Sequence, residues 1–181
     1  MKVRESFARE TAQSLLNEVG CHQFPIDMAK VCRSKGWIVA RSRKVHQDCD
    51  AVTMHINGEY GIYLHEGIKS ESRIRWTLSH EAGHILLGHF AEFDLTFSHS
   101  EALGKGTAWI LNRETNIFTE EFLMPADFIR ENLCMGFESL RAACGVSRPA
   151  LEIRLRSLSL TNPAIYPDSE AHYGLGRVAE G

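Results

Sequence analysis

The apolar positions divide the chain into a helical start, a β-rich middle and a helical second half. Residues 4–19 are charged, with apolar side chains at roughly helical intervals, and predict a helix. Residues 25–32 predict a second helix, with Pro25 as its first residue and Gly36 just beyond its end. The apolar run 37–40 follows and predicts a buried strand.

Two β-rich segments, 51–56 and 60–64, flank the dipeptide Asn57-Gly58. Asn-Gly is typical of a type I′ hairpin turn, because both central residues of that turn need positive φ. We therefore expect a small antiparallel sheet in the middle of the chain. Its free edge would be able to hold an extended peptide by adding it as another strand.

Helical spacing returns after the hairpin. We expect a helix that contains residues 76–89, with Ser70 as its N-cap, and then a loop over 91–108. A further helix is predicted over 109–124, and Pro125 ends it. Shorter helices are predicted for residues 126–133, 137–144 and 148–158.

These patterns predict an α+β fold, in which a small antiparallel sheet packs on a helical bundle. With 181 residues, 44% of them hydrophobic and 24% charged, the chain is typical of a soluble globular protein. We expect residues 1–160 to form a single domain, with 137–158 as a helix-turn-helix-like subregion. Residues 161–181 are richer in Pro, Gly and polar residues and predict a loose C-terminal tail.

Charge, cysteine usage and hydropathy narrow the class of protein. The net charge of −3 argues against a chain built wholly around nucleic acid. No apolar run is long enough to cross a membrane, and the first ten residues contain no signal-peptide core. The five cysteines are widely spaced and form no C-x-x-C, so neither a disulfide scaffold nor a cysteine zinc site is expected. A reducing cytoplasm fits these features best.

The candidate chemistry lies in an H-E-x-x-H motif formed by His80, Glu81 and His84. On a helix the two histidines project from one face and can bind two corners of a tetrahedral Zn²⁺ site. Glu81 is then placed to act as a general base on a metal-bound water. The competing interpretation is that both histidines are surface residues of an ordinary helix.

The residues after the motif exclude the metzincin version of the site. That version needs a Gly three residues and a His six residues after the second histidine, where this chain has Leu87 and Phe90. His89 falls one position short of the required histidine. We expect His89 to be an imidazolium at the helix end, where it would meet the C-terminal dipole.

Two segments carry a resemblance to a known family. Residues 77–84 read T-L-S-H-E-A-G-H, and residues 114–125 read E-T-N-I-F-T-E-E-F-L-M-P. In this order and spacing they resemble the ImmA/IrrE family of metallopeptidases, over roughly residues 20–160. The resemblance implies a thermolysin-like site with one Zn²⁺ per chain and a cytoplasmic protein. It also implies a partner, because several such proteins of phages and mobile elements cleave or antagonise a helix-turn-helix repressor.

Carried over residue by residue, the resemblance makes His80 and His84 the metal ligands and Glu81 the catalytic residue. The family's third ligand is a Glu four residues before an Asn, and that position here is Asn112. Asn116 follows one turn later and is expected to support the site rather than bind the metal.

A neutral amide is a weaker zinc ligand than a carboxylate. Glu114 is the backup ligand, although it points about 200° round the helix from Asn112. A shifted helix that presents Glu114 or Glu120 and a site that has lost its metal both stay open.

The donor that would stabilise the oxyanion is not identified by the sequence. His89, His99, Tyr60 and Tyr63 are candidates, and each also fits a purely structural role.

A non-enzymatic function is the alternative. Residues 140–156 have helix-turn-helix character and carry Arg148, Arg154 and Arg156. The segment could bind DNA or dock a repressor without cleavage, or it could be a helical hairpin that completes the core. The hairpin interpretation is favoured, because three arginines are few for phosphate binding.

Overall fold

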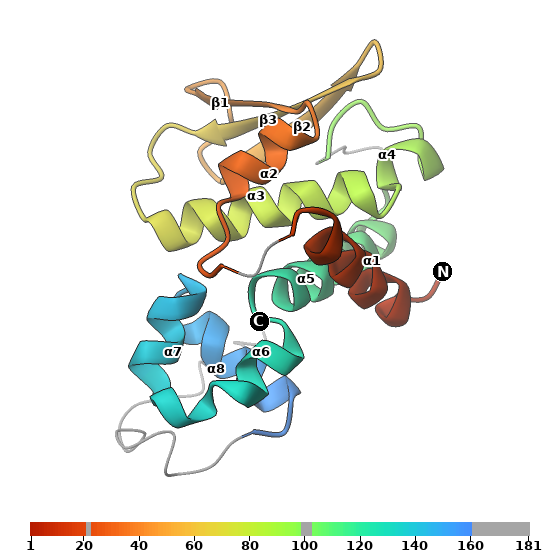
Figure 1. The fold of residues 1–181 in the computed structure, drawn as a ribbon. Coiled ribbons are helices and arrows are strands. Elements are labelled where there is room, and N and C mark those ends of the chain that lie inside the picture. The colour runs from red at the N-terminus through yellow and green to blue at the C-terminus, as the bar shows by residue number, and fades with distance from the viewer. Residues whose placement is uncertain (21–22, 99–102, 161–181) are drawn as a thin grey trace, which may run out of the picture.

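A computed structural model describes residues 1–20, 23–98 and 103–160, so the predicted tail at 161–181 lies outside the described residues. The fold is α+β, as predicted: a small sheet lies over α3, α3 packs on α5, and α1 packs against α5 (Figure 1). Helices α6, α7 and α8 lie at the other end of the molecule. The first half of the chain forms α1 (Glu5–Glu18), α2 (Met28–Ser34), β1 (Ile38–Ser42), β2 (Ala51–Ile56), β3 (Glu59–His65) and α3 (Glu71–Leu86). The second half forms α4 (His89–Glu92), α5 (Lys105–Leu123), α6 (Ala126–Glu131), the 3-10 turn Leu133–Met135, α7 (Phe137–Cys144) and α8 (Arg148–Ser157).

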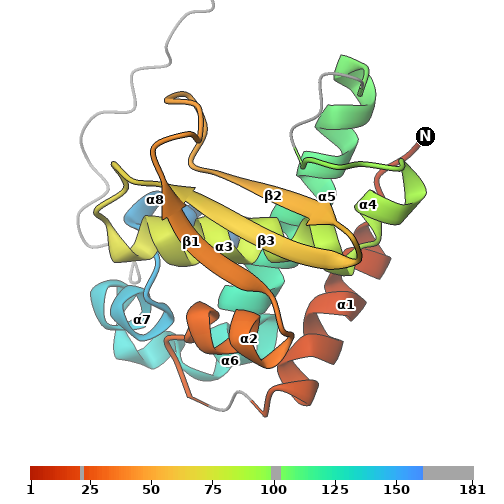
Figure 2. The same cartoon turned by 90° about the horizontal axis from the view of Figure 1, so that it is seen from above.

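The hairpin prediction is confirmed, but the sheet is mixed rather than wholly antiparallel. Asn57 and Gly58 have φ of 53° and 83°, and β2 pairs antiparallel with β3. β1 pairs in parallel with the other side of β3, so the strand order is β1-β3-β2 (Figure 2). β3 is the most buried of the three strands and takes the centre, which leaves β1 and β2 at the two edges.

The outer edge of β2 is not free along its whole length. Residues 96–98, which belong to the segment expected to be a loop, lie against it through a bridge between Met54 and Phe97. The backbone N–H of His55 donates to the carbonyl of Thr96 at 3.0 Å. The expectation of a free edge is therefore corrected for the second half of β2.

Two predicted helix starts are also corrected. Asp27 is the N-cap of α2, and its side chain accepts a hydrogen bond from the backbone N–H of Lys30, so the helix begins after Pro25. α5 begins at Lys105, inside the segment expected to be a loop, because helical structure extends one turn before the apolar stripe that marked its predicted start. α4 also forms within that segment.

α7 and α8 complete the core as a helical hairpin. Gly145 joins them in the left-handed conformation with φ of 64°. Arg154 is 0% exposed and pairs with Glu121, whereas Arg148 pairs with Glu138 on α7. The buried guanidinium cannot contact phosphate, so the geometry weakens the DNA-binding interpretation.

The described ranges contain no helix that is both long and apolar enough to span a membrane. Among the same residues the cysteines are free, and none forms a disulfide. The assignment of residues 1–160 to a single domain stays a prediction.

Candidate active site

The H-E-x-x-H motif lies in the second half of α3, which crosses the molecule between the sheet and α5 (Figures 1 and 2). The helix begins as predicted, because the Ser70 side chain accepts a hydrogen bond from the backbone N–H of Arg73. Gly83 lies within the motif and faces α5. A Cβ there would lie 3.1 Å from the Phe118 ring and 3.3 Å from Thr115, so glycine permits this approach.

His80 and His84 lie side by side on α3, with ring centroids 5.1 Å apart. The ring of His80 faces α5: its Nδ1 lies 3.1 Å from Oδ1 of Asn116, and its Nε2 lies 3.2 Å from the Thr115 hydroxyl. The structure thus brings together both predicted histidine ligands and the predicted supporting residue Asn116. If Asn116 accepts from Nδ1–H of His80, the lone pair of that imidazole lies on Nε2.

Glu81 is buried beneath the sheet. The hydroxyl of Thr53, on β2, donates a hydrogen bond of 2.6 Å to Oε2 of Glu81. Thr53 is held in turn, because its backbone N–H donates to the Ser98 hydroxyl at 3.0 Å. One carboxylate oxygen of the expected general base is therefore positioned by the strand above it.

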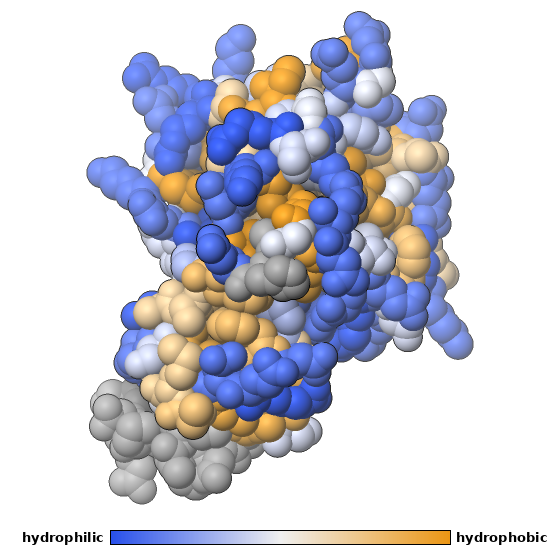
Figure 3. Space-filling model, in the orientation of Figure 1, coloured by the Kyte–Doolittle hydropathy of each residue, from blue (hydrophilic) through white to orange (hydrophobic). Residues whose placement is uncertain are grey.

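A cleft of about 420 Å³ opens over His80 and Glu81. A second cavity of about 660 Å³ lies beside it between α3, α5 and α8, and the two share Asp50, Trp76 and Asn116. The outline of the molecule is indented between the part that carries the sheet and the part that carries α7 (Figure 3). The lining of the smaller cleft is Asp48, Cys49, Asp50, Ala51, Trp76, Thr77, His80, Glu81 and Asn116.

His89 is not the imidazolium expected at the end of the motif helix. Gly88, with φ of 76°, redirects the chain after α3, and His89 begins α4 fully buried. Its Nδ1 lies 3.0 Å from Nδ1 of His84, and its Nε2 lies 3.1 Å from Oε2 of Glu114. Burial lowers the pKa of His89, and the hydrogen bond to Glu114 offsets this only in part, so a neutral imidazole is expected at neutral pH.

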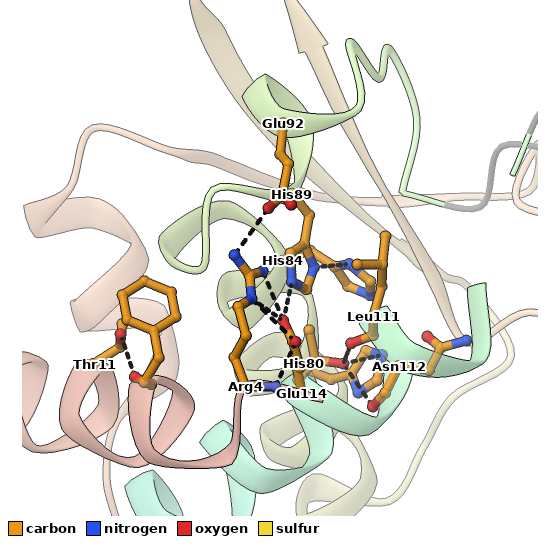
Figure 4. A network of polar contacts seen from close by, with 11 residues as sticks. Arg4, Thr11, His80, His84, His89, Glu92, Leu111, Asn112 and Glu114 are labelled. Atoms are coloured by element: carbon orange, nitrogen blue, oxygen red, sulfur yellow. Dashed lines mark hydrogen bonds and ion pairs between the residues drawn. The ribbon is translucent and has the colours of Figure 1, made fainter. Parts of the chain in front are cut away.

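Glu114 is bound by Arg4, which precedes α1 (Figure 4). The backbone N–H of Arg4 donates to Oε1 at 2.8 Å, and its guanidinium donates to Oε2 at 2.7 Å through NH2. Burial raises the pKa of Glu114, but the hydrogen bonds from Arg4 more than offset this, and the pKa lies below its usual value. Glu114 is therefore ionised at neutral pH.

The candidates for a third ligand are placed differently from one another. Asn112 is half-buried on α5, one turn before Asn116, and its side chain points away from the histidine cluster in Figure 4. Glu114 is held behind the motif by Arg4, and Glu120 is buried 3.9 Å from Arg113. Among the residues that the structure describes, no three His, Cys, Asp or Glu side chains gather into one metal-binding group.

The oxyanion candidates stay untested. Tyr60 stacks on His55 with ring centroids 4.3 Å apart, and Tyr63 pairs with Ala40 and Val52 across the sheet. Neither lines the cleft over Glu81. His99 lies outside the described residues.

The donor set around His80 and His84 fits part of a zinc site. Both imidazoles have Nδ1 within hydrogen-bond distance of another polar group, which is how proteins orient Nε2 toward a metal. Sequence reasoning missed Thr53 and Arg4, because neither is close to the motif along the chain. The spacing of His89 was noticed, but nothing local indicates that it turns inward.

Comparison with known proteins gives one family. The family model of the IrrE N-terminal-like domain, a peptidase domain, matches residues 34–156, which contain the motif helix, the sheet and α5. No curated protein matches the chain.

Proposed function

The chain belongs to the peptidase family of the IrrE N-terminal-like domain, and from this premise we propose that it is a zinc-dependent endopeptidase. The observation that supports the proposal best is the pair His80 and His84 beside a cleft, with the Glu81 carboxylate positioned by Thr53. A structural helix needs no such arrangement, because a buried carboxylate costs free energy unless it is satisfied.

Each residue has a distinct role in this proposal. His80 and His84 hold the ion, and Asn112 is the proposed third ligand once its side chain turns toward the histidines from the orientation in Figure 4. Zn²⁺, when bound, supplies Lewis acidity toward a water and the scissile carbonyl. Glu81 accepts the proton of the attacking water and delivers it to the leaving amine.

Thr53 keeps one oxygen of Glu81 hydrogen-bonded, so that the other oxygen can face the cleft. A carboxylate held in this way has fewer orientations to lose when it takes up the proton. The cleft and the adjoining cavity together could accommodate several residues of a peptide.

The proposed substrate is a peptide bond in a partner protein, of which a helix-turn-helix repressor in the cytoplasm is the first candidate. This rests on the family rather than on any pocket. A second function is supported by Asn112: with an amide where the family places a carboxylate, zinc would be held weakly. The protein would then act as a regulator that binds the repressor without cutting it.

Zinc content and the Glu81→Gln variant separate the two functions. Protein purified without chelator should carry about one zinc per chain. The test substrate is a helix-turn-helix repressor from the same genome, which the wild type should cleave, as seen by mass spectrometry of the products. Glu81→Gln should bind zinc and fold normally but cleave at least about 100-fold more slowly, as expected for loss of a general base.

Glu131→Gln is the matched control, because Glu131 is exposed on α6. It should cleave like the wild type. If wild type and Glu81→Gln act alike on the repressor, the non-cleaving function is the correct one. Asn112→Glu tests the third position, since a ligand there predicts tighter zinc binding in the variant.

A further inference from the structure

We infer that Arg4, Glu114 and His89 form a hydrogen-bond relay that sets the tautomer of His84 and thereby directs its Nε2 lone pair toward the metal. The relay rests on the proposed function, since it gives the metal ligand His84 a fixed orientation. Its three members are positioning residues and do not contact the substrate.

The relay begins with an ionised carboxylate. Glu114 is 0% exposed, and Arg4 donates to both of its oxygens: Nε lies 3.1 Å from Oε1 and 3.0 Å from Oε2. The backbone N–H and NH2 of Arg4 add two further bonds. Such bidentate, charge-assisted contacts hold the carboxylate both charged and fixed in orientation.

The positions of the protons follow from that charge. Oε2 of Glu114 is an acceptor only, so Nε2 of His89, at 3.1 Å, must be the donor. A neutral imidazole carries one N–H, so Nδ1 of His89 has the lone pair. Nδ1 of His84, at 3.0 Å, must then donate to it, and the lone pair of His84 lies on Nε2.

The two motif histidines differ in what fixes the orientation of their imidazoles. His80 is partly exposed, and the amide of Asn116 faces its Nδ1. An amide can present either its oxygen or its NH2 group, whereas the Glu114 carboxylate can only accept. His84 is 2% exposed, so bulk water cannot orient it, and the carboxylate transmits one proton arrangement through His89.

The relay also extends the site beyond the residues that match the family. Arg4 lies outside the matched range 34–156, and Glu114 lies inside it. α1, which follows Arg4, packs along α5. The N-terminal segment therefore contributes to orienting the candidate metal site.

The Glu114→Gln variant tests the relay, because its amide should invert the chain of protons. Each oxygen position of Glu114 faces two donors of Arg4, so an amide NH2 opposes Arg4 at either one. The Oε2 position also faces Nε2 of His89, which can accept in its other tautomer. The amide NH2 is therefore expected at the Oε2 position, donating to Nε2 of His89. Nδ1–H of His89 would then donate to His84, whose proton would move to Nε2.

Imidazole ¹⁵N shifts of the metal-free full-length chain report this tautomer directly. His84 should be the Nδ1–H form in the wild type and the Nε2–H form in Glu114→Gln, whereas His80 should not change. Zinc affinity, measured by competition with a chromophoric chelator, should fall about 10- to 100-fold in Glu114→Gln.

His89→Gln is the rescue variant. Its amide oxygen can accept from Nδ1–H of His84 while its NH2 donates to Glu114, so it should keep the wild-type tautomer and bind zinc within a few-fold of wild type. His89→Leu can do neither and should show an Nε2–H population on His84. If Glu114→Gln fails to fold, the comparison of His89→Leu with His89→Gln decides the result.

The relay is overturned if His84 is the Nε2–H form in the wild type, or if its tautomer is the same in wild type, Glu114→Gln and His89→Leu. A tautomer that inverts as expected in a protein that binds no zinc supports the relay and contradicts the proposed function. If the wild type binds zinc and cleaves but the His84 tautomer does not change in the variants, the proposed function is supported and the relay is contradicted. Glu131→Gln should behave as wild type in every measurement.

Discussion

Two buried carboxylates on α5, Glu114 and Glu121, form the same kind of ion pair for different purposes. They lie seven residues apart, about two helical turns, and each is bound by an arginine from outside α5. Arg4 binds Glu114 from the N-terminal end of the described chain, and Arg154 binds Glu121 from α8 near the other end.

The two carboxylates differ in the hydrogen bonds that they accept besides those from arginine. Glu114 accepts from His89 and so connects to the motif histidines. Glu121 accepts from the Gln13 side chain at 2.6 Å and from the backbone N–H of Ala126 at 3.3 Å, at the start of α6. One pair supports the candidate site, whereas the other fastens α1, α5, α6 and α8 together.

The arginines differ in burial as well. The side chain of Arg154 is 0% exposed, and its Nε donates to the carbonyl of Met124 at 2.9 Å. The side chain of Arg4 is 34% exposed, so water screens part of its interaction. We therefore expect the first pair to matter more for the proposed zinc binding and the second to matter more for stability.

Arg154→Met should have the largest effect. It leaves Glu121 buried without its cation and should lower the free energy of unfolding by about 3–5 kcal/mol, as measured by urea denaturation. Zinc affinity should stay as in the wild type at temperatures where the variant is folded. Arg156→Met is the control: the Arg156 side chain is 60% exposed, and its loss should cost less than about 0.5 kcal/mol.

Arg4→Met should change zinc affinity more than it changes stability. The free energy of unfolding should fall by only about 1–2 kcal/mol. The backbone N–H of residue 4 and Nε2 of His89 still bond to the Glu114 carboxylate, and water can replace the partly exposed guanidinium. Zinc affinity should fall about tenfold as the Glu114 carboxylate loses its fixed orientation. If the variant loses stability as Arg154→Met does but keeps wild-type zinc affinity, the two pairs have the same role and the comparison fails.

Acid should weaken the ion pair of Glu121 with Arg154, because protonation removes the charge of the carboxylate. Burial raises the pKa of Glu121, but Arg154 and the other hydrogen-bond donors lower it by more. The pKa in the folded protein therefore lies below the usual 4.5. Stability from this group is full above about pH 4.5 and is lost as the pH falls through the native pKa. Glu121→Gln should therefore show a flatter decline of unfolding free energy with acid than the wild type, and a slope equal to wild type would contradict the role of this pair.

The smallest effect concerns the thiol near Arg154. Burial outweighs the nearby Arg154 cation and raises the pKa of Cys144 to about 12. Cys134 is exposed. Iodoacetamide should therefore label Cys134 rapidly and Cys144 only through local opening, and zinc should not change the rate at Cys144. Rapid labelling of native Cys144, read by mass spectrometry, would show that the Glu121 end of α5 is less tightly packed than the structure indicates.

The sequence by itself determined the features that depend on local spacing. His80 and His84 share a helix face because four residues make about one turn, and Asn57-Gly58 forms a tight turn because it tolerates positive φ. The α+β class followed from the same periodicities.

Only the tertiary structure decided which distant side chains meet. Arg4 and Glu114 are 110 residues apart in the chain, and no local pattern pairs them. The inward turn of His89, the parallel pairing of β1 and the burial of Arg154 likewise depend on packing between elements. Local periodicity specifies which face of an element is apolar, but a buried charge acquires its partner only when the elements come together.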